Sequence, residues 1–216
     1  MKYKVEAIQK IKIMLDDKYF EEYFKSYTKE DFPSFQKNVK NRAENEYLDI
    51  VIRMDIDFNN PFTVSLIEAI FYFSIIAELQ SLKWNKNMIK ETIHNYYQKQ
   101  LIDQEEHLKD IGKTFFTMKN VDTLVYYSQS NQDNQFKEDY IVKYDKSLIK
   151  KGKLTNKTYQ CPICFFSKKA DVFDSLNIIC ELDFIRSKFM NTNLSRTYCL
   201  AASDSYCDFI WEGKFS

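Results

Sequence analysis

Apolar side chains recur at three- and four-residue steps through most of the first 135 residues, the spacing that places them on one face of a helix. The first apolar stripe predicts a single helix over residues 5–24. A second helix is predicted over residues 34–45, directly after Pro33 and with a charged outer face. Residues 49–58 alternate less clearly, which favours a connection or a short extended segment.

Residues 62–82 form the most apolar stretch of the chain and follow Pro61. Glu68 and Glu78 interrupt it, so the longest run without a charged side chain is the nine residues 69–77. A membrane-spanning helix needs about 20 predominantly apolar residues. The stretch therefore predicts a buried central helix, and we expect no membrane association.

The pattern continues as helices predicted over residues 85–101 and 103–119. A further helix over residues 121–128 fades into the polar run 129–135. The helical part of the chain is thus expected to end at about residue 135.

Two extended-looking pieces, residues 140–144 and 154–160, flank Gly152 and predict a β-hairpin. A short helix is predicted to begin at Cys161-Pro162, because proline is favoured in the first turn of a helix. A longer helix is predicted over residues 174–190.

The chain ends with two predicted strands, residues 194–201 and 206–211. The order of elements indicates an α+β fold, in which an N-terminal helical layer packs on a small antiparallel sheet of about four strands with two inserted helices. We expect a helical region, residues 1–135, and a cysteine-containing α+β region, residues 136–216, to form one compact domain.

Composition supports this fold class and narrows the function. The 216 residues include only three Gly and three Pro, under 3% together, where average usage is about 12%, so a turn-rich β-sandwich or barrel is excluded. The 31 basic and 31 acidic side chains cancel, which leaves no electrostatic footprint for nucleic acid.

All five cysteines lie between Cys161 and Cys207. The chain starts with a charged amphipathic pattern rather than a secretory leader, so we expect a cytoplasmic protein whose thiols are reduced. Clustered thiols in such a protein indicate catalysis, metal binding or simple packing.

Cys161 is the first candidate catalytic residue on physical grounds. It precedes Pro162 at a predicted helix N-terminus, where unpaired N–H groups and the helix dipole stabilise a thiolate and lower the cysteine pKa from about 8.5. Packing at the helix start explains the same pattern equally well.

The Cys161-x-x-Cys164 spacing also permits zinc or a redox pair. A structural zinc site normally has four ligands, and only one such pair is present, while His94 and His107 lie far away on helices that we expect to expose them. Zinc would have to recruit Cys180 and Cys207 through the fold, and we expect neither a metal nor another cofactor.

Two further constellations are candidates. Cys180 and Asp183 are three residues apart on a predicted helix and so share a face. A buried carboxylate there would orient a substrate or perturb the thiol; the alternative is that Asp183 faces solvent.

In the last predicted strand, alternation places Cys207 and Asp208 on opposite faces of the sheet. Arg196, in the preceding strand, would bind a carboxylate or close a surface ion pair. Cys199 is assigned no role.

Four motifs over residues 158–211 resemble the bacterial L-2-amino-thiazoline-4-carboxylic acid hydrolase family in order and spacing. They are YQCPICFF at 159–166, ICELD at 179–183, LSRT at 194–197 and SDSYCDF at 203–209. A weaker match extends upstream to residues 60–62 and the apolar helix after them.

The resemblance implies hydrolytic opening of a thiazoline ring at the amidine-like carbon between the ring nitrogen and sulfur, giving an N-carbamoyl-cysteine. The matching candidates are Cys161, Cys180, Asp183 and Cys207 for catalysis, with Arg196 and Asp208 for substrate binding. The motif does not say which cysteine attacks, and the helix N-terminus favours Cys161.

The chain departs from the family pattern at two places. Ser203 replaces the usual glycine of the final turn, and Ile210 replaces an arginine that usually follows the Cys-Asp-Phe motif. If the glycine serves close approach of the substrate, Ser203 would narrow the site.

Other functions remain alternatives. A related enzyme of small-metabolite biosynthesis would run acyl transfer or cyclisation, in the bond-forming direction. A second class is a zinc-containing sensor module that binds a small ligand, and a third is an interaction domain. In the leading hypothesis the partner is a small-molecule substrate, and the sequence leaves a homo-oligomer open.

Overall fold

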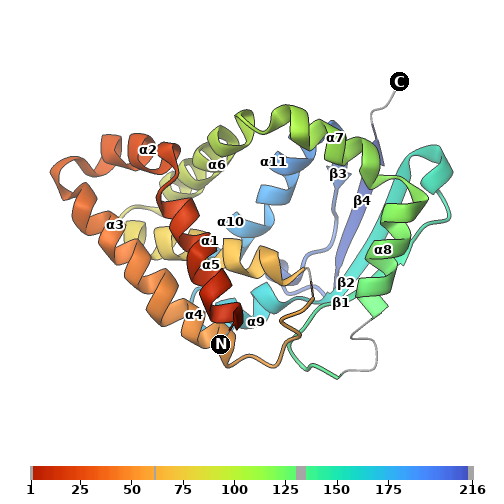
Figure 1. Cartoon of the computed structure of the whole chain (residues 1–216), viewed down its shortest axis with the longest axis horizontal. Helices are drawn as coiled ribbons and strands as arrows, with labels where there is room; N and C mark the ends of the chain where they lie inside the picture. Colours follow the sequence, from red (N-terminus) through yellow and green to blue (C-terminus); the bar gives the residue numbers. More distant parts are fainter. Residues whose placement is uncertain (1, 61, 130–134, 214–216) are drawn as a thin grey trace.

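The central helix α5 (Thr63–Ser81) organises the computed structural model, which describes residues 2–60, 62–129 and 135–213. Other helices surround α5 (Figure 1), and 13 of its 19 residues are buried. The helix is long and apolar enough to cross a membrane, yet 72% of its apolar window is covered by the rest of the chain. The predicted buried central helix is confirmed.

The N-terminal apolar stripe forms two helices, α1 (Lys2–Leu15) and α2 (Lys18–Thr28), so the single helix predicted over residues 5–24 is wrong. The break has a local cause at Asp17. Its backbone is extended and its carboxylate accepts the Tyr19 backbone N–H at 3.1 Å. Aspartate is among the preferred residues for capping a helix in this way.

The next predicted helix is α3 (Phe32–Asn41), which has Pro33 in its first turn and runs on into a π-helical segment, η2 (Arg42–Tyr47). A short helix, α4 (Leu48–Ile52), follows, so the prediction of a non-helical connection from residue 49 is wrong for its first residues. Leu48 and Val51 are fully buried, and this three-residue step is enough to hold one more helical turn against the core.

Helices α6 (Lys86–Ile102), α7 (Glu105–Phe115) and α8 (Met118–Gln129) match the three predicted helices to within a few residues. Asn85 caps α6, because its side-chain oxygen accepts the Met88 N–H at 3.0 Å. Most of the polar run predicted after α8 lies outside the described residues.

Four strands form one antiparallel sheet in the order β1-β2-β4-β3. Strands β1 (Ile141–Asp145) and β2 (Lys153–Gln160) make the predicted hairpin, with Gly152 at φ 68°. Strand β4 (Cys207–Gly213) lies between β2 and β3 (Thr192–Ser195). The α+β class and the four-stranded sheet are confirmed.

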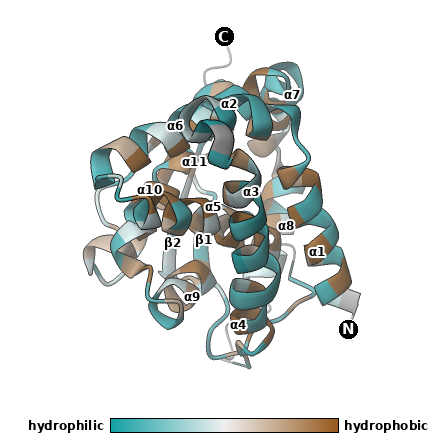
Figure 2. Cartoon of the chain, turned by 90° about the vertical axis from the view of Figure 1, so that its left-hand side faces the viewer, coloured by the Kyte–Doolittle hydropathy of each residue, from teal (hydrophilic) through white to brown (hydrophobic). Residues whose placement is uncertain are grey.

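Two inserted helical segments connect the hairpin to β3. The first is α9 (Pro162–Lys169), as predicted, and the second is split at Glu181 into α10 (Leu176–Cys180) and α11 (Leu182–Phe189), so the single helix predicted over 174–190 is wrong. One buried core cluster runs from Ala7 to Met190 and includes side chains of both halves of the chain. Figure 2 shows the polar outer faces of the helices around this core.

The third strand is shorter than the predicted 194–201, because the chain leaves the sheet after Ser195. The Asp208 carboxylate accepts the backbone N–H groups of Thr197 (2.8 Å) and Tyr198 (2.5 Å), which would otherwise be available to pair in the sheet. A short 3₁₀ turn at Leu200–Ala202 then leads back to β4.

Candidate active site

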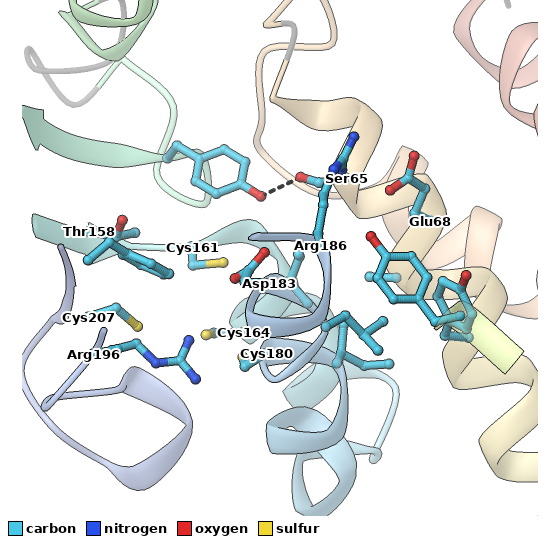
Figure 3. A pocket seen from close by; sticks show the side chains of 18 residues that line it. Ser65, Glu68, Thr158, Cys161, Cys164, Cys180, Asp183, Arg186, Arg196 and Cys207 are labelled. Carbon is cyan, nitrogen blue, oxygen red and sulfur yellow. Dashed lines mark hydrogen bonds between the residues drawn. The ribbon is translucent and has the colours of Figure 1, made fainter. Parts of the chain in front are cut away.

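A cavity of about 180 Å³ lies where α5, the start of α9 and the α10–α11 junction meet strands β2 and β4 (Figure 3). Pockets for drug-sized ligands usually measure about 300–1,000 Å³, so this cavity suits a smaller molecule. Among its lining side chains are four of the five cysteines, two arginines and two acids: Cys161, Cys164, Cys180, Cys207, Arg186, Arg196, Glu68 and Asp183.

Cys161 occupies the N-cap position of α9, with φ −139° and ψ 120°, directly before Pro162. The proline fixes the first helical turn and removes one of the N–H groups that would otherwise need a partner there. Two backbone N–H groups, those of Cys164 and Phe165, bond to the Cys161 carbonyl at 3.0 and 3.3 Å. The predicted placement of this thiol at a helix N-terminus is confirmed.

The pKa of Cys161 lies below its ordinary value. The largest cause is a hydrogen bond from the Cys164 thiol; the backbone N–H groups of Cys164 and Ile163 and the Tyr140 hydroxyl act in the same direction, whereas burial opposes them. The pKa of Cys164 is raised, because it donates to Cys161 and is buried. The pair therefore favours a thiolate at Cys161 and a thiol at Cys164.

Tyr140 connects this thiolate to the central helix. Its hydroxyl lies 2.9 Å from Ser65 Oγ, near the start of α5, and a hydrogen bond also joins it to Cys161. Burial raises the pKa of Tyr140 well above its ordinary value, so the hydroxyl keeps the proton that it donates.

Cys180 and Cys207, the other two predicted catalytic cysteines, also line the cavity. Hydrogen bonding to Cys199, together with burial, raises the pKa of both thiols. The Cys207 sulfur lies 3.8 Å from the Cys199 sulfur and accepts the Leu200 N–H at 3.2 Å. These two cysteines are therefore held as thiols.

Cys199, to which the sequence assigned no role, is the second cysteine with a lowered pKa. The hydrogen bonds from Cys180 and Cys207 are the main cause, and the Ala201 N–H and the Arg196 charge add to them. Cys199 does not line the main cavity and opens into a neighbouring depression beside Arg196. It is thus an acceptor for the cavity thiols rather than part of the cavity wall.

Asp183 faces the cavity instead of solvent, at the first turn of α11. Figure 3 shows its carboxylate and the Cys161 sulfur turned towards each other. Burial raises the pKa of Asp183 to about 6, while the charges of Arg196 and Arg186 act in the opposite direction. The expected pairing of Cys180 and Asp183 on one face holds even though the helix breaks at Glu181.

The two predicted substrate-binding residues are placed differently. The Arg196 guanidinium lines the cavity and lies over the rings of Phe184 (5.0 Å) and Phe209 (5.4 Å). Asp208 is not among the cavity-lining residues, and its carboxylate holds the backbone of Thr197 and Tyr198. The structure therefore brings Arg196 to the candidate site and gives Asp208 a structural position instead.

Sequence reasoning missed several cavity residues from other parts of the chain: Ser65, Glu68, Tyr97, Tyr140 and Arg186. Glu68 carried a signal, because an acid inside a buried apolar helix needs a partner or an aqueous cavity. Its carboxylate pairs with Lys10 at 3.0 Å and lies 33% exposed. Arg186 lies one helical turn beyond Asp183 and could have been found from that spacing.

The described part of the chain provides no set of side chains for binding a metal ion. Over residues 2–60, 62–129 and 135–213, no group of three or more His, Cys, Asp or Glu side chains is arranged to hold an ion. All five cysteines are free. His107 is exposed as expected, but His94 is partly buried, and its Nε2 lies 3.2 Å from the Ile178 carbonyl, so the expectation of exposure was wrong for His94.

The two departures from the family pattern lie outside the cavity wall. Ser203 has φ 68°, a left-handed conformation that glycine adopts without cost, so the usual glycine is explained by the turn itself. Neither Ser203 nor Ile210 lines the main cavity, but Ser203 lines a neighbouring depression together with Cys161 and Cys164.

The fold and the cavity define a cysteine-rich α+β protein with a small, thiol-lined pocket. The model of the L-2-amino-thiazoline-4-carboxylic acid hydrolase family matches residues 64–211, and the chain belongs to this family. The match covers α5, the whole cavity and most of β4. No curated protein and no solved structure matches the chain.

Proposed function

We propose that this chain is a cysteine-dependent hydrolase that opens a small amidine- or thiazoline-like ring, with a 2-aminothiazoline carboxylate as the model substrate. The family description supports hydrolysis of this substrate class. The observation that carries the proposal is the Cys161 thiol: it begins a helix, has a lowered pKa and faces the Asp183 carboxylate across a small cavity.

In the first step the Cys161 thiolate attacks the ring carbon between nitrogen and sulfur. A carbon–sulfur bond to the enzyme forms, the bond to the ring sulfur breaks, and the departing thiolate takes a proton. The product of this step is an isothiourea on Cys161. Lowering the cysteine pKa matters because the thiolate, not the thiol, is the nucleophile.

In the second step water attacks the same carbon and expels the Cys161 thiolate. The nitrogen atoms stay on the carbon, so the product is a urea carrying a free thiol, and one water has been consumed. Asp183, with a pKa of about 6, is ionised at neutral pH and accepts a proton from that water, as a general base does.

Charged side chains position the substrate. An ionised Asp183 binds the N–H groups of the amidinium, as a carboxylate binds a guanidinium. Arg196 and Arg186 supply positive charge for the substrate carboxylate. Arg186 also interacts with the charge of Glu68. Cys180 and Cys207 line the cavity as thiols whose S–H groups donate to Cys199.

Ring opening can be followed directly, because it releases a thiol that Ellman's reagent detects. With L-2-aminothiazoline-4-carboxylate, the wild-type chain should release one thiol per substrate, and Cys161→Ser should lose at least about a thousandfold in kcat/KM. Cys199→Ala is the matched control, because this cysteine does not line the cavity. Its activity should stay within about tenfold of wild type, and equal losses in both variants would refute the assignment.

The bond-forming direction uses the same thiolate and carboxylate and remains the alternative. Hydrolysis is preferred because the matching family is described as a hydrolase. The zinc-containing sensor is not supported, because the described residues provide no set of metal ligands.

A further inference from the structure

A second cavity, of about 240 Å³, adjoins the cysteine cavity. The two share five lining residues: Ser65, Tyr140, Thr158, Asp183 and Phe209. The second cavity is bounded by the sheet on one side and by α7 and α8 on the other. A ligand group that binds Asp183 therefore borders both cavities.

Aromatic rings line much of the second cavity, whereas the first has four charged side chains in its wall. Phe115 and Trp211 lie 5.1 Å apart between ring centroids, and Phe209 is stacked on Trp211 at 6.5 Å. Leu124 of α8 and Val142 of β1 add aliphatic walls. An apolar space of this kind gives water few partners and favours an apolar ligand group, with aromatic rings preferring tilted or offset contacts.

We propose that the natural substrate carries an apolar group, about the size of a phenyl ring, on the amidine nitrogen that Asp183 binds, and that this group occupies the second cavity. The inference rests on the proposed function, since it is Asp183 that places the amidine. A 2-aminothiazoline carboxylate fills only the cysteine cavity, and a substituent on its exocyclic nitrogen is directed along the shared wall.

Because the two cavities share lining residues, one substrate can occupy both, and two separate ligands are not required. Asn156, a buried polar residue of β2, lies beside the aromatic rings, and its amide donates to Thr158 Oγ1 at 3.5 Å. An amide of this kind selects orientation in a largely apolar pocket. The cavities thus provide one end with thiols and charged side chains, one aromatic end, and a carboxylate between them.

Two matched probes test the inference: L-2-aminothiazoline-4-carboxylate and its 2-anilino analogue. The chain has two tryptophans, so Trp84→Phe leaves Trp211, in the wall of the second cavity, as the only indole. In that background the anilino probe should quench Trp211 fluorescence and bind at least about tenfold tighter than the amino probe. The amino probe should bind without that quenching.

Leu124→Phe fills the second cavity, and Leu148→Phe makes the same change on the hairpin at a residue 37% exposed and outside both cavities. Leu124→Phe should remove the tenfold advantage of the anilino probe and leave binding of the amino probe within about twofold, which also reports that the variant is folded. Leu148→Phe should keep the advantage.

The outcomes separate this inference from the proposed function. If the amino probe binds and releases thiol while the anilino probe binds no tighter, or keeps its advantage in Leu124→Phe, the inference is overturned and the proposed function stands. If neither probe binds, both are overturned.

Discussion

The Tyr140 hydroxyl and Ser65 Oγ lie 2.9 Å apart and join the residue before β1 to the start of α5. Ser65 Oγ donates its proton to the Phe62 carbonyl at 2.6 Å, and the hydrogen bond from Tyr140 lowers the pKa of Cys161. The contact between Ser65 and Tyr140 therefore ties the hydroxyl that donates to the Cys161 sulfur to the central helix.

Tyr140→Phe should raise the pKa of Cys161, because it removes a donor to the thiolate. A hydrogen bond to a charged group contributes about 1.5–3 kcal/mol, so the midpoint of Cys161 alkylation by iodoacetamide should move up by about one to two pH units. Tyr159→Phe, at a residue 41% exposed, is the control and should leave the midpoint in place. An unchanged midpoint in Tyr140→Phe would show that this hydrogen bond does not lower the pKa of Cys161.

Asp183→Asn should stabilise the fold while abolishing hydrolysis. Burial raises the pKa of Asp183 from 3.8 to about 6, so the folded state binds more protons than the unfolded state between these values. Stability from this group therefore falls as pH rises through that window, and at pH 7 the ionised carboxylate costs about 3 kcal/mol, which Asn removes.

Urea unfolding at pH 4 and pH 7 measures this effect. The stability gain of Asp183→Asn should be present at pH 7 and small at pH 4, where wild-type Asp183 is largely protonated. Asp208→Ala should instead lower the free energy of unfolding by about 1 kcal/mol at pH 7, because the Asp208 carboxylate accepts two backbone N–H groups. Destabilisation by Asp183→Asn at pH 7 would contradict the assigned burial penalty.

Gly112→Ala should destabilise the chain by about 3 kcal/mol or more. A Cβ added at Gly112 on α7 would lie 1.9 Å from the Met190 carbonyl oxygen, and that neighbour is backbone, which cannot rotate away. Thr114→Ala, on an exposed part of the same helix, is the control. Equal urea midpoints for the two variants would show that the helix does not pack this closely in solution.

Ser203→Gly should stabilise the final turn by up to about 1 kcal/mol. Ser203 holds φ 68°, where a side chain costs about 1–2 kcal/mol, and the greater freedom of glycine in the unfolded chain offsets part of the gain. Thermal unfolding gives the comparison. A melting temperature that is unchanged or lower in Ser203→Gly would contradict the backbone strain at this position.

Much of the fold is readable from apolar spacing, because α5, the hairpin and α9 are each specified by local pattern. The predictions are wrong where a single polar residue determines where a helix or strand ends. Asp17 ends one helix and caps the next, and Asp208 draws the backbone after Ser195 out of the sheet. Hydrophobic periodicity alone does not register such contacts.

The candidate site was predicted in part for a similar reason. Helix spacing pointed to Cys161 and to the pair Cys180 and Asp183, and the resemblance to the family added Cys207; all four line the cavity. Cys199 and Tyr140 matter through hydrogen bonds across elements that are distant in sequence, and no short motif signals those.

The central claim, that Cys161 is the nucleophile, is tested most directly by labelling with limiting 2-chloroacetamidine and mapping the modified peptide by mass spectrometry. This reagent carries the amidine that Asp183 should bind, and a thiolate displaces its chloride. We expect modification of Cys161 and a slower reaction in Asp183→Asn. Preferential modification of Cys180, Cys199 or Cys207 would contradict it.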